Sequence, residues 1–332
     1  MVYFYKIKKI FDNIYNIFSI IYFMIIKYIL GGTQMNKILV IGTTSWDTII
    51  SINEFPSKPT TIFASDYKQV LGGTAAGKAI NLSKLGFDVT LATKFGNDEA
   101  GKNIKNVLSS EKIKFFYIED KKSTEMHTNL MDSHGKRISI YTHVGMVNQD
   151  IDLKPFKKAI DDADIILLDI CEFVKHLFPL LKDYKNKIWL DIHDYDGKNP
   201  WHKEFIPYAD AIFMSSDSIH SKTELKSLTK ELIKDKKFVV CTHGKLGSEI
   251  LMNTGEIYSE GILRQYRLVD SNGAGDSFVS GFLYGFSKQK PITDCLKYAT
   301  LVSSLTITSP YLYSSKLNSD WLEQEFENNF NI

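Results

Sequence analysis

The sequence predicts an α/β fold, with a doubly wound, mostly parallel β-sheet, helices on both faces and a small separate β-sheet as a lid. Three observations predict it. Short, continuously apolar runs recur along the chain, helical patterns lie between them, and two pairs of strand-like segments interrupt the alternation. Continuous apolar runs are typical of parallel strands that are buried on both faces.

The composition excludes several classes of protein. The 332 residues include 40 Lys and Arg and 39 Asp and Glu, so the net charge is +1. Nucleic-acid binding needs a basic surface, and this balance argues against it. Hydrophobic residues make up 44% of the chain, which is typical of a globular protein. The three cysteines are Cys171, Cys241 and Cys295. Their spacing matches neither a metal site nor a disulfide framework, which favours a reducing, cytoplasmic location.

Residues 1–34 differ from the rest. Basic residues precede the apolar run 17–26, which resembles a marginal signal anchor or hydrophobic segment. We favour a different interpretation, and so expect no membrane partner. Gly31-Gly32 can be encoded by a ribosome-binding sequence at a normal distance from Met35, and a predicted strand follows at once. We therefore expect translation to start at Met35, residues 1–34 to be a non-native upstream extension, and residues 35–332 to form a single domain.

The predicted main sheet takes its strands from six apolar runs, at 38–41, 89–92, 165–168, 188–190, 211–214 and 238–241. Helical patterns over 75–85 and 100–110 lie between them. Consecutive βαβ units of this kind bring the carboxyl ends of the strands to one edge of the sheet, where ligands bind in such folds.

The predicted lid takes its strands from 49–52 with 61–70 and from 127–131 with 137–142, within the regions 47–70 and 124–143. A turn-rich stretch, 132–136, joins the second pair. Such strands have no place in a βαβ unit, so we expect a small sheet that stands off the main one and covers a site. An edge extension or a homodimer surface is the alternative.

A glycine-rich segment, Asp270 to Asp276, carries the strongest chemical signal. Its stretch 273–275 allows backbone amides to approach a ligand closely, and apolar residues at helical spacing follow it. The loop therefore opens a helix, whose free amides and dipole form an anion site. Asp276 beside that site would repel a phosphate unless it accepted a proton from a hydroxyl that attacks phosphorus.

A second glycine-rich segment spans Leu71 to Gly86. Gly72 and Gly73 precede an Ala-rich helical pattern that ends at Leu85-Gly86, a favourable C-cap. Small residues allow the start of this helix to approach a ligand or another backbone. A tight turn before a buried helix explains the pattern about as well.

Together, the two segments resemble the signatures of the ribokinase-like carbohydrate kinases. Residues 270–276 resemble the C-terminal signature, and residues 72–86 with 94–98 resemble the N-terminal one, over a similarity that covers nearly all of 37–310. The resemblance implies a doubly wound sheet with a β-lid. It also implies transfer of the γ-phosphate of ATP, with Mg²⁺, to a hydroxyl of a sugar, nucleoside or related small alcohol.

The resemblance also implies residue roles. Asp276 would be the catalytic base, and Asp47 would bind a substrate hydroxyl. The anion hole would be formed by Gly273, Ala274 and Gly275, the substrate pocket would be lined by Gly72 and Gly73, and the nucleotide side would be formed by Thr242, Gly244 and Gly247. Each has a plainer alternative: a strand-end turn residue at Asp47, and a simple hairpin at Gly244 and Gly247.

Two stretches of the chain depart from the family pattern. Gly77 stands where the first signature usually has Asn, so one substrate contact is missing. Ser215 and Ser218 stand where the family commonly has Asn-x-x-Glu near the metal and phosphates, with Asp217 beside them. The sequence therefore assigns no metal ligand. The run Asp191-Ile192-His193-Asp194 looks like a metal pair by composition, but neighbouring residues at a strand end rarely converge on one ion, so we discount this run as a metal site.

The substrate class stays open at this point. A sugar is favoured. The residue before Gly273 is Asn272 and not Thr, which resembles the pattern of adenosine kinases in this superfamily. This residue supports a nucleoside as the alternative substrate. A non-catalytic ligand-binding homologue is a third interpretation, but a binding protein has no need of Asp276. Trp46 beside Asp47 either stacks on the substrate or belongs to the core.

Overall fold

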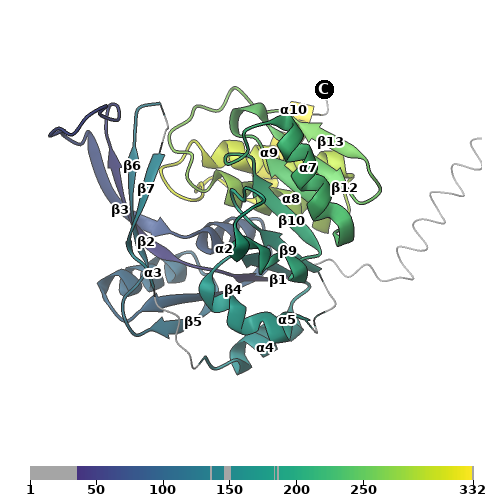
Figure 1. Cartoon of the computed structure of the whole chain (residues 1–332), viewed down its shortest axis with the longest axis horizontal. Coiled ribbons are helices and arrows are strands. Elements are labelled where there is room, and N and C mark those ends of the chain that lie inside the picture. The colour runs from purple at the N-terminus through teal and green to yellow at the C-terminus, as the bar shows by residue number, and fades with distance from the viewer. Residues whose placement is uncertain (1–35, 135–136, 146–150, 183, 185–186, 331–332) are drawn as a thin grey trace, which may run out of the picture. The chain divides into compact units, whose positions relative to one another are not determined.

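The computed structural model describes residues 36–134, 137–145, 151–182, 184 and 187–330 (Figure 1). The expected upstream extension, residues 1–34, and the expected start at Met35 lie outside these residues. In the described part of the chain, no helix is both long and apolar enough to cross a membrane.

The described residues contain a nine-stranded main sheet in the order β13-β12-β11-β10-β9-β8-β1-β4-β5 (Figure 1). The strands from β5 to β11 in this order run parallel, β12 runs antiparallel to β11, and β13 runs antiparallel to β12. Their bounds are β1 Lys37–Ile41, β4 Asp88–Gly96, β5 Lys114–Asp120, β8 Ile165–Asp169, β9 Lys187–Asp191, β10 Ala211–Ser215, β11 Phe238–Thr242, β12 Ser248–Met252 and β13 Ile257–Glu260.

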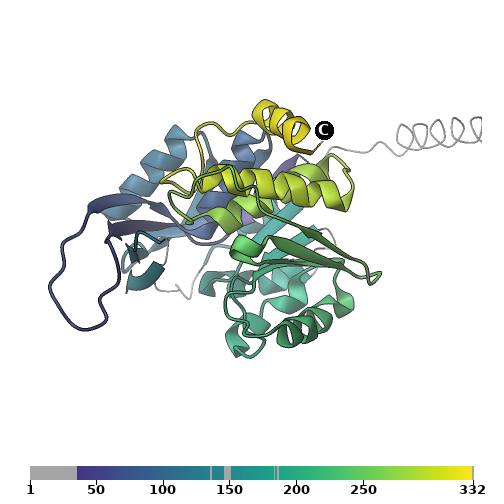
Figure 2. The same ribbon diagram turned by 90° about the horizontal axis from the view of Figure 1, so that it is seen from above.

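Helices cover both faces of this sheet (Figure 2). On one face α8 packs directly on the strands, where Trp189 meets Phe282 and Phe286 edge to face. On the other face Phe156, Leu177 and Leu228 belong to one apolar cluster with the strands. The helices are α2 Thr74–Lys84, α3 Glu99–Ser110, α4 Lys154–Asp162, α5 Phe178–Lys182, α6 Pro200–Lys203, α7 Lys222–Leu232, α8 Ala274–Ser287, α9 Ile292–Thr306 and α10 Ser319–Phe330, with short 3₁₀ turns at Glu172–Leu177, Ile206–Tyr208, Ile233–Asp235 and Gly244–Leu246.

A separate small sheet, the lid, has the order β3-β2-β6-β7 in the residues that the structure describes (Figure 1). Its strands are β2 Ser45–Ser51, β3 Asp66–Gly72, β6 Met126–Met131 and β7 Arg137–His143. The expected strand over 61–70 is too long, since β3 begins only at Asp66. The reason is that β2 ends at Ser51, which pairs with Asp66, so residues 61–65 have no strand beside them.

This architecture confirms the predicted fold class, a mostly parallel sheet with helices on both faces and a separate small sheet. All six apolar runs lie within buried parallel strands. Because those strands are parallel, their carboxyl ends share one edge, and β8, β9, β10 and β11 place Asp169, Asp191, Ser215 and Thr242 there. Ligand sites in open α/β sheets lie at this edge.

Candidate active site

The buried ammonium group of Lys78 lies among three carboxylates. Its Nζ is 2.7 Å from Asp169 Oδ1, 2.9 Å from Asp191 Oδ2 and 2.9 Å from Asp276 Oδ1. Lys78 belongs to α2, Asp169 and Asp191 end β8 and β9, and Asp276 lies in the first turn of α8. The side chain of Lys78 is only 1% exposed. This Lys78 cluster therefore ties four elements together and carries an excess of negative charge.

The charges of the cluster shift the proton affinities of its members. Burial lowers the pKa of Lys78, but the three carboxylates outweigh burial and raise that pKa well above its ordinary value. Burial raises the pKa of Asp276, Lys78 opposes this effect, and the negative charges of Asp169 and Asp191 add to it. The net effect is a raised pKa, so Asp276 is a stronger base than an exposed aspartate.

The N-terminus of α8 presents open backbone amides beside Asp276. Gly273, which caps the helix, has a φ of 77°, and a Cβ there would lie 2.8 Å from the backbone of Leu312. The amide of Ala274 donates to Ser271, and the amide of Ser277 donates to Gly273. In the described residues the amides of Gly275 and Asp276 have no such partner. Amides left open at a helix start bind anions.

Gly77 makes room for Asp276. A Cβ at position 77 would lie 2.9 Å from Asp276 Oδ2 and 3.1 Å from its Cβ. Any side chain at Gly77 would therefore press on the carboxylate. Asn81, one turn later on α2, turns away from this region and donates to the carbonyl oxygens of Gly77 and Leu312. It holds the backbone in place and does not replace the missing Asn.

On the lid side, Asp47 is buried at 4% exposure between β6 and the start of α2. His127 Nδ1 lies 3.3 Å from Asp47 Oδ1, and Asn129 donates to Asp47 Oδ2 over 3.3 Å. A side chain at Gly72 would overlap the Asp47 carboxylate, and Gly73 faces the backbone of Thr43 in the same way. The structure thus brings Asp47 and Gly72 into contact, with Gly73 next in the chain, and their binding of substrate stays a prediction.

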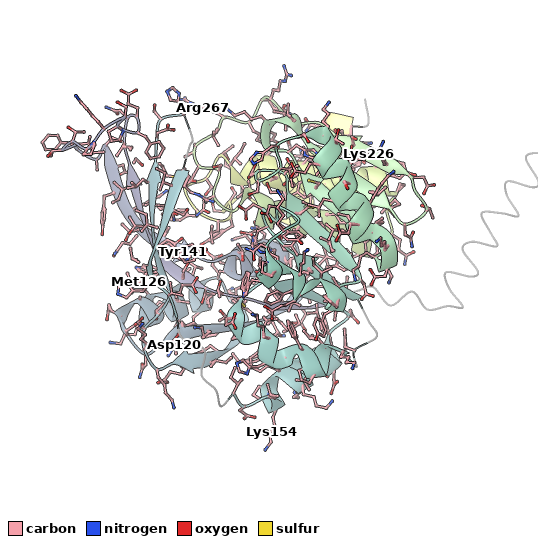
Figure 3. All side chains as sticks on the ribbon, in the orientation of Figure 1. Asp120, Met126, Tyr141, Lys154, Lys226 and Arg267 are labelled. Atoms are coloured by element: carbon pink, nitrogen blue, oxygen red, sulfur yellow. The ribbon has the colours of Figure 1, made fainter. Side chains whose placement is uncertain are left out.

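His127 carries a positive charge next to Asp47. Its Nε2 lies 3.0 Å from Glu125 Oε1, and its ring packs on that of Tyr141 with centroids 4.1 Å apart. Burial lowers the pKa of His127, but the carboxylates of Asp47 and Glu125 outweigh burial and raise it to about 9. Tyr141, labelled on the lid in Figure 3, is 61% exposed and offers an aromatic side chain beside His127. Trp46 does not share this site, because neighbouring side chains on a strand point to opposite faces.

The residues expected to form the nucleotide side lie further along the same sheet edge. Thr242 ends β11, and Gly244 and Gly247 have φ values of 53° and 95° in the turn that leads into β12. This turn is a hairpin between antiparallel strands. The carbonyl oxygen of Thr242 accepts a hydrogen bond from the amide of Ser216, just beyond β10. The turn is therefore a hairpin at the ligand edge of the sheet, and its nucleotide-binding role stays a prediction.

Comparison with known proteins decides the family. Residues 35–319 match the model of the pfkB family carbohydrate kinases. The chain belongs to the pfkB family. Its members are kinases, so the chain is a phosphotransferase of the sugar or nucleoside kinase type, and the resemblance seen in the sequence is confirmed.

Relatives span nearly the whole pfkB domain. The acarbose 7(IV)-phosphotransferase of Actinoplanes sp. is 26% identical over 296 residues, which cover 84% of this chain and 94% of the relative. The ribokinase of Dictyostelium discoideum is 25% identical over 305 residues, covering 82% and 95%. The solved structure of the microbiome-derived acarbose kinase Mak1 superposes with a TM-score of 0.76 at 22% identity, covering 88% of this chain and 99% of that one.

The two serines that depart from the pfkB pattern, Ser215 and Ser218, make local hydrogen bonds. Ser218 donates from Oγ to Asp194 Oδ2 over 3.0 Å, and Ser215 accepts a hydrogen bond from the amide of Asp217. The described residues contain no group of three or more His, Cys, Asp or Glu side chains arranged to hold a metal ion. The carboxylate of Asp191 pairs with Lys78 Nζ at 2.9 Å.

Sequence reasoning missed two members of the Lys78 cluster, Lys78 itself and Asp169. A signal for each was present. Lys78 interrupts the small and apolar stretch 75–80 of a helix predicted to be buried, and Asp169 ends an apolar strand at the ligand edge. Lysines and aspartates are almost never fully buried unless they are paired. Only the fold shows that these charges pair with one another.

Proposed function

We propose that this pfkB kinase transfers the γ-phosphate of ATP to a hydroxyl of a small sugar. In this reaction Asp276 acts as base, and the loop of Gly273, Ala274 and Gly275 forms the anion hole. The amide of Ala274 already donates to Ser271, so the open amides of this loop and helix start are those of Gly275 and Asp276. The observation that supports the proposal most directly is the position of Asp276. Its buried carboxylate, with a raised pKa, stands in the first turn of α8 beside the open amides of Gly275 and of Asp276 itself.

The proposed chemistry is an in-line displacement. The substrate oxygen forms a bond to the γ-phosphorus, the bond from that phosphorus to the bridging oxygen breaks, and ADP leaves. The hydroxyl proton passes to Asp276, whose raised pKa suits a base at neutral pH. Open amides at the start of α8 stabilise the negative charge on the moving phosphoryl group. Positioning and electrostatics supply most of the rate in such transfers.

Asp47 is proposed to bind the substrate hydroxyls, with Gly72 and Gly73 lining the pocket. His127 and Asn129 hold its carboxylate from two sides, so Asp47 is oriented before the substrate arrives. The exposed ring of Tyr141 next to His127 offers a flat apolar face, which a sugar ring can pack on.

A nucleoside is the alternative acceptor, and Asn272 favours it. Its side-chain oxygen accepts a hydrogen bond from Arg137 of the lid, so this residue lies where the lid meets the phosphoryl site. A non-catalytic binding protein is the third candidate. The combination of an intact Asp276 and open helix amides argues against it, since binding alone has no use for a base.

ATP is proposed to bind along the strand edge near Thr242, Gly244 and Gly247. Mg²⁺ normally enters such sites with the nucleotide phosphates and needs only one or two protein carboxylates. Asp191 pairs with Lys78 and so forms no pair of ligands with Asp194, but Asp194 alone fits that donor chemistry. Its carboxylate accepts a hydrogen bond from the hydroxyl of Ser218, at the position where the family commonly has Glu. We propose that Asp194 holds the ion, and bound Mg²⁺ would neutralise charge on the phosphates.

Two further proposals concern the setting of the enzyme. The lid strand β7 is a sheet edge that exposes Ile138 and Ile140, each 47% exposed, and this strand would pair two copies in a homodimer. Light scattering of the purified chain would test the dimer.

The free thiols of Cys171, Cys241 and Cys295 are all buried, in keeping with a reducing cytoplasm.

The deciding experiment measures ATP consumption with Mg²⁺ against pentoses, hexoses, phosphosugars and nucleosides, with the Asp276→Asn variant in parallel. Turnover on one acceptor class that is lost in the variant would support the proposal and choose between sugar and nucleoside. No turnover on any acceptor, together with a ligand that raises the melting temperature, would favour a binding protein instead.

A further inference from the structure

Lys78 has no part in the reaction proposed above, yet it is the most buried charge next to the proposed base. Removing an ammonium group from water is costly unless other charges compensate it. The negative charge around Lys78 exceeds what its ammonium group needs, since three carboxylates lie within 2.9 Å of its Nζ: Asp169, Asp191 and Asp276. A purely structural ion pair needs one carboxylate. The third partner, Asp276, is the one that the proposed chemistry uses.

Lys78 engages only one oxygen of Asp276. Its Nζ holds Oδ1, whereas Oδ2 lies on the side of Gly77, where the absent side chain leaves space. In the part of the chain that the structure describes, Oδ2 accepts no hydrogen bond. One carboxylate oxygen is therefore anchored, and the other is open to accept a proton.

We infer that Lys78 is a positioning residue for the base: it anchors Asp276 Oδ1 to the ends of β8 and β9 and so directs Oδ2 towards the acceptor hydroxyl. This inference rests on the proposed function, which makes Asp276 the base. Thr74 supports the arrangement, because its hydroxyl donates to Asp169 Oδ2 over 2.7 Å and so orients the carboxylate that anchors Lys78. The two neighbouring residues therefore act together on Asp276: the missing side chain at Gly77 leaves space for Oδ2, and Lys78 fixes the orientation of the carboxylate.

The same geometry predicts how the pH profile responds. The charged groups that face Asp276 are Lys78 from α2, Asp169 from β8 and Asp191 from β9. Without the ammonium group, Asp276 faces two carboxylates with no opposing charge. Its pKa then rises, and the acid limb of the activity profile moves to higher pH.

The test compares Lys78→Met with Lys78→Arg and with Lys84→Met. Lys84 is a matched control, since it lies on the same helix and pairs with Glu111 over 3.0 Å away from the proposed base. We expect Lys78→Met to lower kcat by about tenfold or more, with KM for ATP and acceptor nearly unchanged. The acid limb should move up by about one pH unit. Lys78→Arg should recover part of kcat, and Lys84→Met should match the wild type.

A double variant, Lys78→Met with Asp169→Asn, guards against misfolding because it restores the net charge of the cluster. It should fold and still show the low kcat. A folded Lys78→Met or double variant with wild-type kcat and an unshifted profile, beside an inactive Asp276→Asn, would overturn the role of Lys78 alone. A wild type that phosphorylates no acceptor would instead overturn the proposed function, and the role of Lys78 with it.

Discussion

The guanidinium group of Arg137, on the lid strand β7, donates a hydrogen bond to the side-chain oxygen of Asn272 over 3.0 Å. Asn272 directly precedes Gly273, which caps α8. A second contact comes from the opposite edge of the lid, where Lys68 lies 3.5 Å from Asp270 and donates to the carbonyl oxygen of Pro310. Both edge strands of the lid therefore reach the loop that opens α8.

Arg137→Ala should weaken lid closure. We expect KM for the acceptor to rise by roughly threefold to tenfold, because one hydrogen bond to the loop is lost. ATP hydrolysis in the absence of acceptor should rise as well, since an open lid admits water. Steady-state kinetics check both values. Arg264→Ala, at an exposed position that does not belong to the lid, is the control, and equal effects of the two variants would contradict this role of the lid.

Asp276→Asn should separate activity from stability. Turnover should fall by about 100-fold or more because the base is lost. The free energy of unfolding should stay level or rise, because the raised pKa of Asp276 means that its ionised form costs stability in the folded state. Turnover assays and urea unfolding at neutral pH measure the two effects. A variant that loses stability and keeps its turnover would refute the assignment.

His127 should make stability depend on pH. Its pKa of about 9 in the folded protein exceeds the ordinary value of 6.5, so the charged form stabilises the fold. This contribution, about 3 kcal/mol at most, is fully present below pH 6.5 and is lost as the pH rises through 9. Urea unfolding at several pH values would show the loss. His127→Gln should flatten that part of the curve, whereas His143→Gln, at an exposed lid position, should leave it unchanged.

Gly77→Ala should lower kcat although it favours the helix. An alanine inside a helix is better than glycine by about 1 kcal/mol, so the free energy of unfolding should not fall by much. The new Cβ would lie 2.9 Å from Asp276 Oδ2 and displace the carboxylate. We expect a drop in kcat of about tenfold, with KM for ATP unchanged. Wild-type kcat in this variant would show that Asp276 does not depend on the space at Gly77.

Local sequence patterns were enough to predict much of the fold and part of the candidate site. Continuous apolar runs predicted the parallel strands because a strand buried on both faces has no polar side. Gly273 and Asp276 could be singled out because a glycine-rich loop at a helix start is a local anion-binding motif. The predicted strand 61–70 is too long at its start, because the length of a strand depends on where the neighbouring strand ends. Here β2 ends at Ser51, which pairs with Asp66.

The sequence by itself determined the α/β class, the lid and the loop that opens α8, because each depends on residues close together in the chain. Only the tertiary structure decided the partners of the base. Lys78 is 91 residues from Asp169 and 198 from Asp276, and Arg137 is 135 residues from Asn272. Pairs so distant leave no periodicity or spacing to detect. The pairs of Lys78 form because a parallel sheet gathers its strand ends at one edge, where buried charges must find opposite charges. The pair of Arg137 and Asn272 forms because the lid reaches the loop that opens α8.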